Sequence, residues 1–139
     1  MPARHTGRIL ALQALYQLDL VKSPLQEVLS FQWYDKKTEE SERKFAKEII
    51  NGVVENWETL DNIIKAYSKN WEFSRISVVN RCILRLSIYS LINQKNISAK
   101  VVINEAIELT REFEKEESVP FINGILDTIY RDEISKENA

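Results

Sequence analysis

The chain has 139 residues, of which 44% are hydrophobic and 29% charged, and its formal net charge is -2. This length suffices for one domain with its own apolar core, without disulfides or metals. Only 3 Gly and 3 Pro are present, too few for the turns of an all-β fold, so helices joined by short loops are expected. The slightly acidic balance excludes a surface that is basic overall, so any nucleic-acid site must be local.

The single Cys and the single His restrict the chemistry further. One Cys cannot form an internal disulfide, and one of each cannot complete a His/Cys zinc site within one chain. No apolar run approaches the roughly 20 residues that span a bilayer, and the amino terminus lacks the features of a signal peptide. We therefore expect a cytoplasmic protein, not inserted in a membrane, with no metal and no other cofactor.

In the first half of the chain, apolar residues recur at helical spacing in four segments. The first helix carries its apolar face from Ile9 towards Val21. A second is predicted from Ser23 as the N-cap, with Pro24 at the first helical position. The third and fourth take their apolar stripes from residues 45–57 and 60–67, after a charged loop.

The second half predicts three more helices. Residues 78–91 are apolar around most of the helix circumference, as in a central buried helix, so this segment is the expected hub of the fold. Ser98 can cap a sixth helix that reaches Phe113, and Ser118 with Pro120 marks the start of a seventh. The fold class is therefore all-α, with about seven helices in one domain.

Asn51-Gly52 and Asn123-Gly124 each lie between apolar residues, a pattern that by itself favours a β-hairpin. We reject the hairpin because the flanking apolar residues keep a period near 3.6. A glycine inside a helix costs about 1 kcal/mol relative to Ala. We expect that cost to be tolerated because another helix approaches the glycine closely.

No constellation typical of an enzyme is present. There is no Gly-rich phosphate loop and no nucleophile elbow, and Glu105 and Glu108 have no His positioned to complete a metal site. Cys82 lies within the predicted hub helix, where burial is expected, and the nearby Arg81 and Arg85 can pair with acids or meet a partner. The sequence indicates a binding protein, and no catalytic residue is assigned.

The amino-terminal segment is basic, because Arg4, His5 and Arg8 precede the first acid, Asp19. Arg4 and Arg8 are one helical turn apart, so in a helix they can bridge successive phosphates. Tyr16 follows two turns later near the same face. The alternative, equally open at this stage, is a frayed and solvated terminus with Tyr16 in the core.

A second aromatic, Phe121, lies at the start of the last predicted helix. Unpaired bases stack on rings while cations hold the phosphates, and the free N–H groups of a helix start can receive an anion. Phe121 is otherwise a core residue. If the basic start of the chain and this helix start converge in space, they form one site for single-stranded RNA.

Several segments in the same order together resemble the NusB family of bacterial transcription antitermination factors. They cover nearly the whole chain: Arg4 and Arg8, Gln13-Ala14-Leu15-Tyr16, Leu60-Asp61-Asn62-Ile63-Ile64, Ile83-Leu84-Arg85-Leu86-Ser87-Ile88-Tyr89, Val102-Ile103-Asn104-Glu105-Ala106-Ile107-Glu108-Leu109 and Phe121-Ile122-Asn123-Gly124-Ile125-Leu126-Asp127. The Val-Ile-Asn-Glu-Ala-Ile-Glu-Leu run, followed by Phe-Ile-Asn-Gly-Ile-Leu-Asp, is the most specific part.

The resemblance implies two packed helical bundles, at about residues 1–70 and 71–132. It implies a factor that, with NusE, a small-subunit ribosomal protein, binds the boxA element of nascent RNA, notably in ribosomal RNA operons, and recruits the RNA polymerase antitermination complex. Carried over residue by residue, the RNA face comprises Arg4, His5, Arg8, Tyr16, Glu117, Ser118, Phe121 and Asn123. The NusE face comprises the expected exposed start of the hub helix at Asn80 and Arg81.

The chain departs from the family pattern in places. His5, Thr6 and Gly7 stand where many members have a denser arginine tract, and Asn80 stands where an acid is usual. We therefore expect weaker intrinsic RNA affinity and greater dependence on the partner. Two alternatives remain: a helical adaptor that binds NusE or a ribosome-biogenesis partner without touching RNA, and the RNA-guiding half of a methyltransferase, which would need a separate catalytic subunit.

Overall fold

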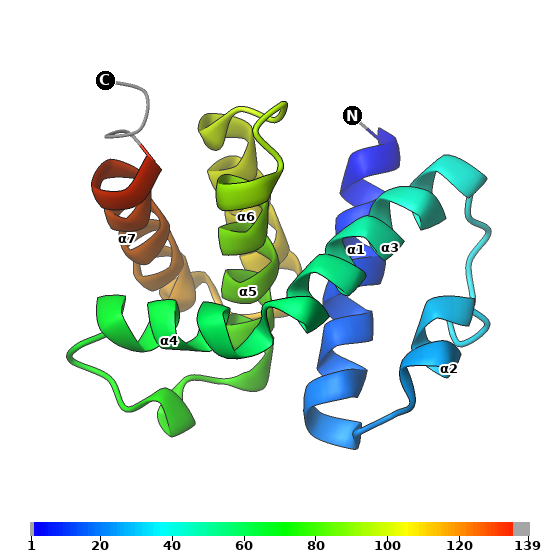
Figure 1. The fold of residues 1–139 in the computed structure, drawn as a ribbon, viewed down its shortest axis with the longest axis horizontal. Helices are drawn as coiled ribbons and strands as arrows, with labels where there is room; N and C mark the ends of the chain where they lie inside the picture. Colours follow the sequence, from blue (N-terminus) through cyan, green and yellow to red (C-terminus); the bar gives the residue numbers. More distant parts are fainter. Residues whose placement is uncertain (1, 135–139) are drawn as a thin grey trace.

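The computed structural model describes residues 2–134, and this part of the chain is all-helical with no strand (Figure 1). Seven α-helices are present, so the predicted fold class is confirmed. Their bounds are α1 Pro2–Tyr16, α2 Leu25–Ser30, α3 Glu40–Glu55, α4 Trp57–Tyr67, α5 Val78–Asn93, α6 Ala99–Phe113 and α7 Val119–Ile129. Short π-helical turns continue α1 over Gln17–Val21 and α7 over Tyr130–Ile134, and 3-10 turns lie at Phe73–Arg75 and Glu116–Ser118.

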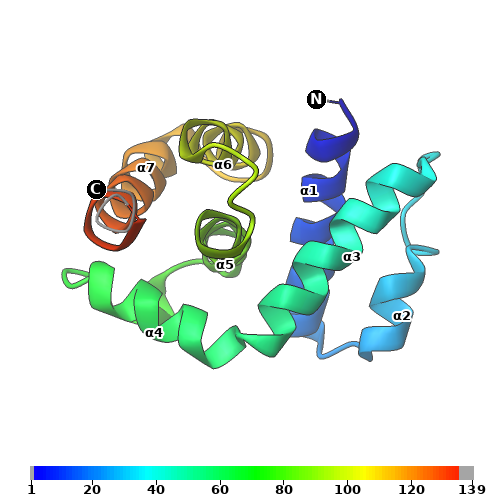
Figure 2. The ribbon, with the colours of Figure 1, turned by 45° about the horizontal axis from the view of Figure 1, so that its top comes forward.

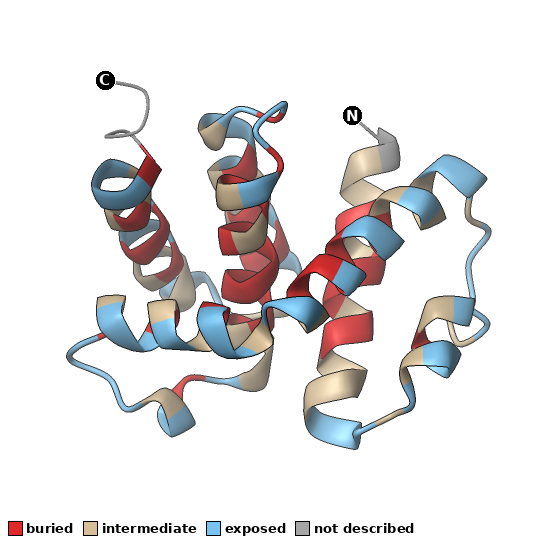
Figure 3. Ribbon diagram, in the orientation of Figure 1, coloured by how far each residue is buried: buried red, intermediate tan, exposed pale blue. Residues whose placement is uncertain are grey.

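Helix α5 is the centre of the fold. It packs against α1 and α3 on one side and against α4, α6 and α7 on the other, as Figures 1 and 2 show. Its residues from Cys82 to Ile88 are all buried, and Figure 3 shows this burial along the helix. The expected hub is confirmed. The division into bundles at about residue 70 stays a prediction, since α4 packs mainly on α5 and α7.

The two Asn-Gly pairs both lie inside helices, so the rejection of hairpins is confirmed. Their glycines differ in surroundings. A Cβ on Gly52 would overlap the ring of Tyr89 in α5, which explains the absence of a side chain where α3 meets α5. A Cβ on Gly124 would meet nothing within 4 Å. The expectation of a close helix approach holds at Gly52 and is wrong at Gly124.

Serine residues cap the starts of α5 and α6. The hydroxyl of Ser77 accepts from the backbone N–H of Asn80 at 3.1 Å, and Ser98 accepts from that of Val101 at 3.2 Å. The cap predicted at Ser23 is wrong. Pro24 itself occupies the N-cap position, with φ -63° and ψ 141°, and it has no side chain that can accept a hydrogen bond.

An internal salt bridge joins the π-helical turn after α1 to α4 and α5. The guanidinium of Arg85, 2% exposed, donates to both carboxylate oxygens of Asp61, at 2.6 and 3.1 Å, and to Asp19 at 2.7 Å. It also lies 4.1 Å from the ring centroid of Trp57. Burial alone would lower the pKa of Arg85, but its bonds to Asp61 and Asp19 outweigh burial and raise it. The expectation that Arg85 pairs with acids is confirmed.

Candidate nucleic-acid interface

The basic start of the chain lies against α6, where two acids meet it. His5 Nδ1 lies 2.9 Å from Glu105 Oε2, and His5 Nε2 lies 3.6 Å from Glu112 Oε2. Glu105 also pairs with Arg8, at 3.6 Å from Nη1. Two carboxylates on one face of α6 therefore hold two of the three residues expected to bind phosphate. We call Arg4, His5, Arg8, Glu105 and Glu112 the amino-terminal cluster.

Arg8 differs most from the sequence expectation. It was expected on a solvent-facing side of the helix beside Arg4, but it is only 2% exposed. Both guanidinium groups lie over the ring of Phe45 in α3, with Arg4 at 5.7 Å and Arg8 at 5.3 Å from its centroid. Burial lowers the pKa of Arg8, Glu105 opposes this effect, and Arg4 adds to it. Arg8 therefore supports the cluster from beneath, and Arg4 and His5 are its more accessible basic residues.

Tyr16 lines a mostly apolar groove further along α1. Its volume is about 350 Å³, and its walls come from α1, α5, the end of α6 and the loop after α2. Two other rings, Trp33 and Phe113, share this groove with Tyr16. The lining residues are Leu12, Gln13, Tyr16, Gln17, Trp33, Val79 and Phe113. Tyr16 is half-buried, so it can present part of its ring to a ligand.

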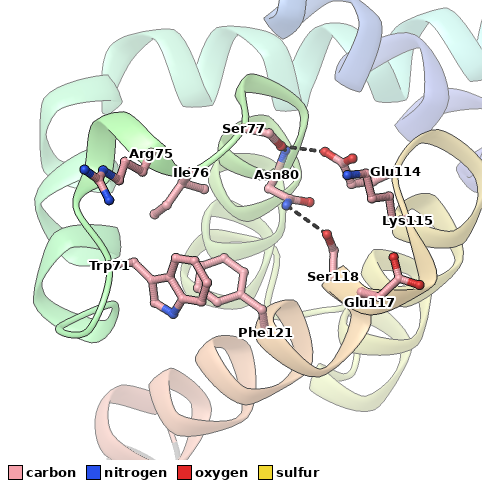
Figure 4. Close-up of a pocket in the computed structure, with 10 residues that line it drawn as sticks. All are labelled: Trp71, Arg75, Ile76, Ser77, Asn80, Glu114, Lys115, Glu117, Ser118 and Phe121. Carbon is pink, nitrogen blue, oxygen red and sulfur yellow. Dashed lines mark hydrogen bonds between the residues drawn. The ribbon is translucent and has the colours of Figure 1, made fainter.

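Phe121 lies in a separate pocket of about 420 Å³, between the loop after α4, the start of α5 and the start of α7 (Figure 4). The pocket brings three predicted site residues together, Glu117, Ser118 and Phe121, with the predicted partner residue Asn80. Asn80 Nδ2 donates to Ser118 Oγ at 3.2 Å, and Ser77 Oγ donates to Glu114 at 2.5 Å. Residues expected on two different faces thus share one hydrogen-bonded pocket. We call it the Phe121 pocket.

The start of α5 is less exposed than expected. Asn80 is 8% exposed, and Arg81 donates to the carbonyls of Ile76 and Phe73, at 2.5 and 3.4 Å, while its side chain is 13% exposed. The expectation of an exposed helix start at Asn80 and Arg81 is therefore wrong. Arg81 is held by carbonyl groups of the loop before α5, and Asn80 faces Ser118 at the start of α7. Asn123, by contrast, is exposed on α7.

The end of α6 connects these three parts. Glu112 contacts His5, Phe113 lines the groove of Tyr16, and Glu114 lines the Phe121 pocket. Three successive residues thus link the amino-terminal cluster, the Tyr16 groove and the Phe121 pocket. We call this surface the α6-end surface. The basic start of the chain and the start of α7 lie on either side of α6 and are joined through it, without direct contact between their predicted site residues.

The α6-end surface contains residues to which the sequence assigned no role in binding, among them Glu105, Glu112 and Trp71. Glu105 and Glu112 are seven residues apart, two helical turns, so their common face could have been read from the spacing. No feature of the neighbouring sequence indicated that Glu105 and Glu112 face the amino terminus. Trp71, which lines the Phe121 pocket and is 57% exposed, lies in the loop after α4, whose position only the fold determines.

Other chemistry in the described residues is limited. Burial raises the pKa of Cys82 to about 12, so its thiol stays protonated, as expected for a core cysteine. Between residues 2 and 134 no group of three His, Cys, Asp or Glu side chains could hold a metal ion. In the same range, no helix has the length and apolar character needed to cross a membrane.

The fold is all-α, and aromatic, basic and acidic residues gather around the end of α6 in an ion-pair cluster, a groove and a pocket. A sequence model of the NusB family matches residues 5–131. The chain belongs to the NusB family.

Individual relatives are similar to this chain over nearly its whole length. A transcription antitermination protein NusB from Leptospira biflexa is 58% identical over 96% of each chain. A structure of T. maritima NusB is 34% identical, with a TM-score of 0.86 over 96% of this chain and 94% of that one. A crystal structure of the antitermination factors NusB and NusE in complex with dsRNA contains a chain that is 26% identical, with a TM-score of 0.83 over 94% of this chain and 98% of that one.

Proposed function

We propose that this chain is an RNA-binding transcription antitermination factor that works in the cytoplasm. With NusE it binds the boxA element of nascent RNA, notably in ribosomal RNA operons, and joins the RNA polymerase antitermination complex. The observation that carries the proposal is the similarity along the whole chain to a NusB that forms a complex with NusE and RNA. It acts by binding, since the α6-end surface offers stacking rings and charges and no arrangement of nucleophile, base and oxyanion donors.

The RNA-contacting residues in this proposal are Arg4 and His5, Tyr16, and Glu117, Ser118, Phe121 and Asn123. Arg8 supports them from below. Rings at two points and cations at a third suit an unpaired strand, whose bases stack while its phosphates meet positive charge. Of the two residues carried over to the NusE face, Arg81 stays in the proposed NusE contact, whereas Asn80 lines the Phe121 pocket.

The electrostatics support a partner-dependent affinity. Glu105 and Glu112 already pair with His5 and Arg8, so the lone protein presents little unneutralised positive charge to phosphates. Each phosphate neutralised by a cation adds to affinity and to its salt dependence. We therefore expect weak binding by the lone protein and stronger binding when NusE adds contacts to the same RNA.

The direct test is fluorescence anisotropy of a labelled boxA-like oligonucleotide, titrated with the lone protein and with the protein plus NusE. A scrambled oligonucleotide is the control. The proposal predicts weak binding that NusE strengthens and salt weakens. Arg4→Ala should reduce the slope of log affinity against log salt by about 0.7, the value for one single-strand contact. Equal binding of the scrambled oligonucleotide would refute boxA recognition.

The same pairing of His5 and Arg8 with acids favours a second candidate, an adaptor that binds NusE and leaves RNA contact to its partner. In that case the lone protein does not shift the anisotropy. Arg4→Ala and Tyr16→Ala then leave RNA binding by the complex with NusE unchanged. Loss of affinity in both variants, with NusE binding intact, would exclude the adaptor.

A further inference from the structure

Trp71 is one of the most exposed large apolar side chains in the described part of the molecule. It lies in the loop after α4 and is 57% exposed, although a tryptophan normally buries most of its large ring. Its ring packs against Phe121 in an edge-like contact, with centroids 5.6 Å apart and planes at 65°. Figure 4 shows the two rings together along one wall of the Phe121 pocket. The indole therefore keeps much of its surface free for another flat group.

The opposite wall is polar and buried. Asn80 Nδ2 is bonded to Ser118, while Asn80 Oδ1 is buried and has no partner among the described residues. A buried carbonyl oxygen without a donor is unfavourable, because it has lost its hydrogen bonds to water without replacement. Two carboxylates, Glu114 and Glu117, line the same side. The pocket thus combines an aromatic wall with one buried acceptor, Asn80 Oδ1, that lacks a donor; Arg75 and Lys115 also line the pocket.

A nucleobase with an exocyclic amine fits both walls. Bases stack on aromatic faces whatever their sequence, and the amines of adenine, cytosine and guanine donate to acceptor oxygens. Uracil has no exocyclic amine, and its one donor on that edge, N3–H, lies between two carbonyl oxygens, so it matches the acceptor Asn80 Oδ1 less well. The pocket volume of about 420 Å³ lies in the usual range for small-ligand sites.

The position of the pocket also suits RNA. Phe113 lines the Tyr16 groove and the next residue, Glu114, lines the Phe121 pocket. A single strand that crosses the end of α6 can therefore place one base in each. An aliphatic side chain of a protein partner would pack on the rings of Trp71 and Phe121 but would leave Asn80 Oδ1 without a donor.

We propose that Trp71, Phe121 and Asn80 form a pocket for one unpaired RNA base that carries an exocyclic amine. Trp71 stacks on the base, and Asn80 Oδ1 accepts a hydrogen bond from the exocyclic amine. This assignment rests on the proposed function, because it specifies how the α6-end surface selects its RNA.

The test uses the full chain with NusE and the labelled boxA-like oligonucleotide. Trp71→Ala should weaken RNA binding by about 5- to 150-fold, the range for loss of one base–aromatic stack. Trp71→Phe should retain most of the affinity, because a ring remains. Val21→Ala, which shortens another exposed apolar side chain at 62% exposure, is the matched control and should have no effect. Circular dichroism checks that each variant is folded.

A second step locates the amine. Each adenine of the oligonucleotide is replaced in turn by purine riboside, which lacks the amine, and each cytosine or guanine by an analogue that lacks its amine. One replacement should weaken binding to the unmodified protein. The same replacement should weaken RNA binding by the Trp71→Ala variant little further, because that variant no longer holds the base in the pocket.

The outcomes separate this inference from the proposed function. If the complex with NusE binds boxA and Trp71→Ala binds it equally well, the pocket assignment fails and the function stands. Weaker binding of Trp71→Ala to NusE without RNA would show that the pocket holds a partner side chain, and would overturn the assignment. If the unmodified complex fails to prefer boxA, both proposals fail.

Discussion

Replacement of Arg85 by methionine should destabilise this protein far more than replacement of an exposed arginine. Arg85→Met removes the guanidinium that joins Asp19 and Asp61, whose side chains are just 15% and 14% exposed, although Asp19 keeps an ion pair with Arg81 at 3.6 Å. Removal of one partner from a buried ion pair costs about 3 to 5 kcal/mol. The two acids retain some exposure, so we expect the lower end of that range, about 3 kcal/mol.

Urea unfolding followed by circular dichroism measures this difference. With a typical slope near 2 kcal/mol per M, a loss of about 3 kcal/mol lowers the urea midpoint by about 1.5 M. Arg111→Met is the matched control, because Arg111 is 49% exposed and pairs only with surface acids, so its cost should stay below about 1 kcal/mol. Equal midpoints for the two variants would refute the reasoning.

Three further predictions concern the fold. Gly124→Ala should raise the free energy of unfolding by up to about 1 kcal/mol, because its Cβ meets no other atom. Gly52→Ala should lower it by about 1 kcal/mol or more, because the ring of Tyr89 must move. Chemical unfolding of both variants measures the contrast. Cys82, with its pKa raised to about 12, should react with a maleimide at pH 8 only as fast as the protein opens, and rapid labelling of the native state would contradict its burial. The hydrogen bond to Glu133 raises the pKa of Tyr67 to about 12, so its contribution to stability is complete below pH of about 10 and is lost as pH rises through 12. A tyrosinate absorbance titration of Glu133→Gln should show one tyrosine titrating earlier than in the unmodified protein.

The helices could be predicted from the sequence because their signals are local. Apolar spacing placed all seven, and the apolar circumference of residues 78–91 identified the central helix. The Ser98 cap was also readable, since a cap depends on residues three or four positions away. The Ser23 cap was misplaced because Pro24 shifted the helix start by one residue, a difference that backbone geometry decides.

The candidate site was less predictable because it depends on contacts between distant segments. Arg8 is buried because Phe45 of α3 and Glu105 of α6 close over it, and neither lies near it in the sequence. Asn80 was placed in the partner face by resemblance, yet it bonds to Ser118 of the expected RNA face. A loop residue such as Trp71 carries no periodic signal, so its exposure could not be read from its neighbours.

The central claim is that one surface around the end of α6 contacts RNA, and amide NMR of the isotope-labelled protein tests it most directly. Addition of boxA RNA to the complex with NusE should shift amides at residues 4–16, 71, 80 and 112–123. Residues on the exposed side of α3, such as Lys47, should keep their positions. Shifts confined to α3 and α4, with residues 112–123 unchanged, would contradict the account.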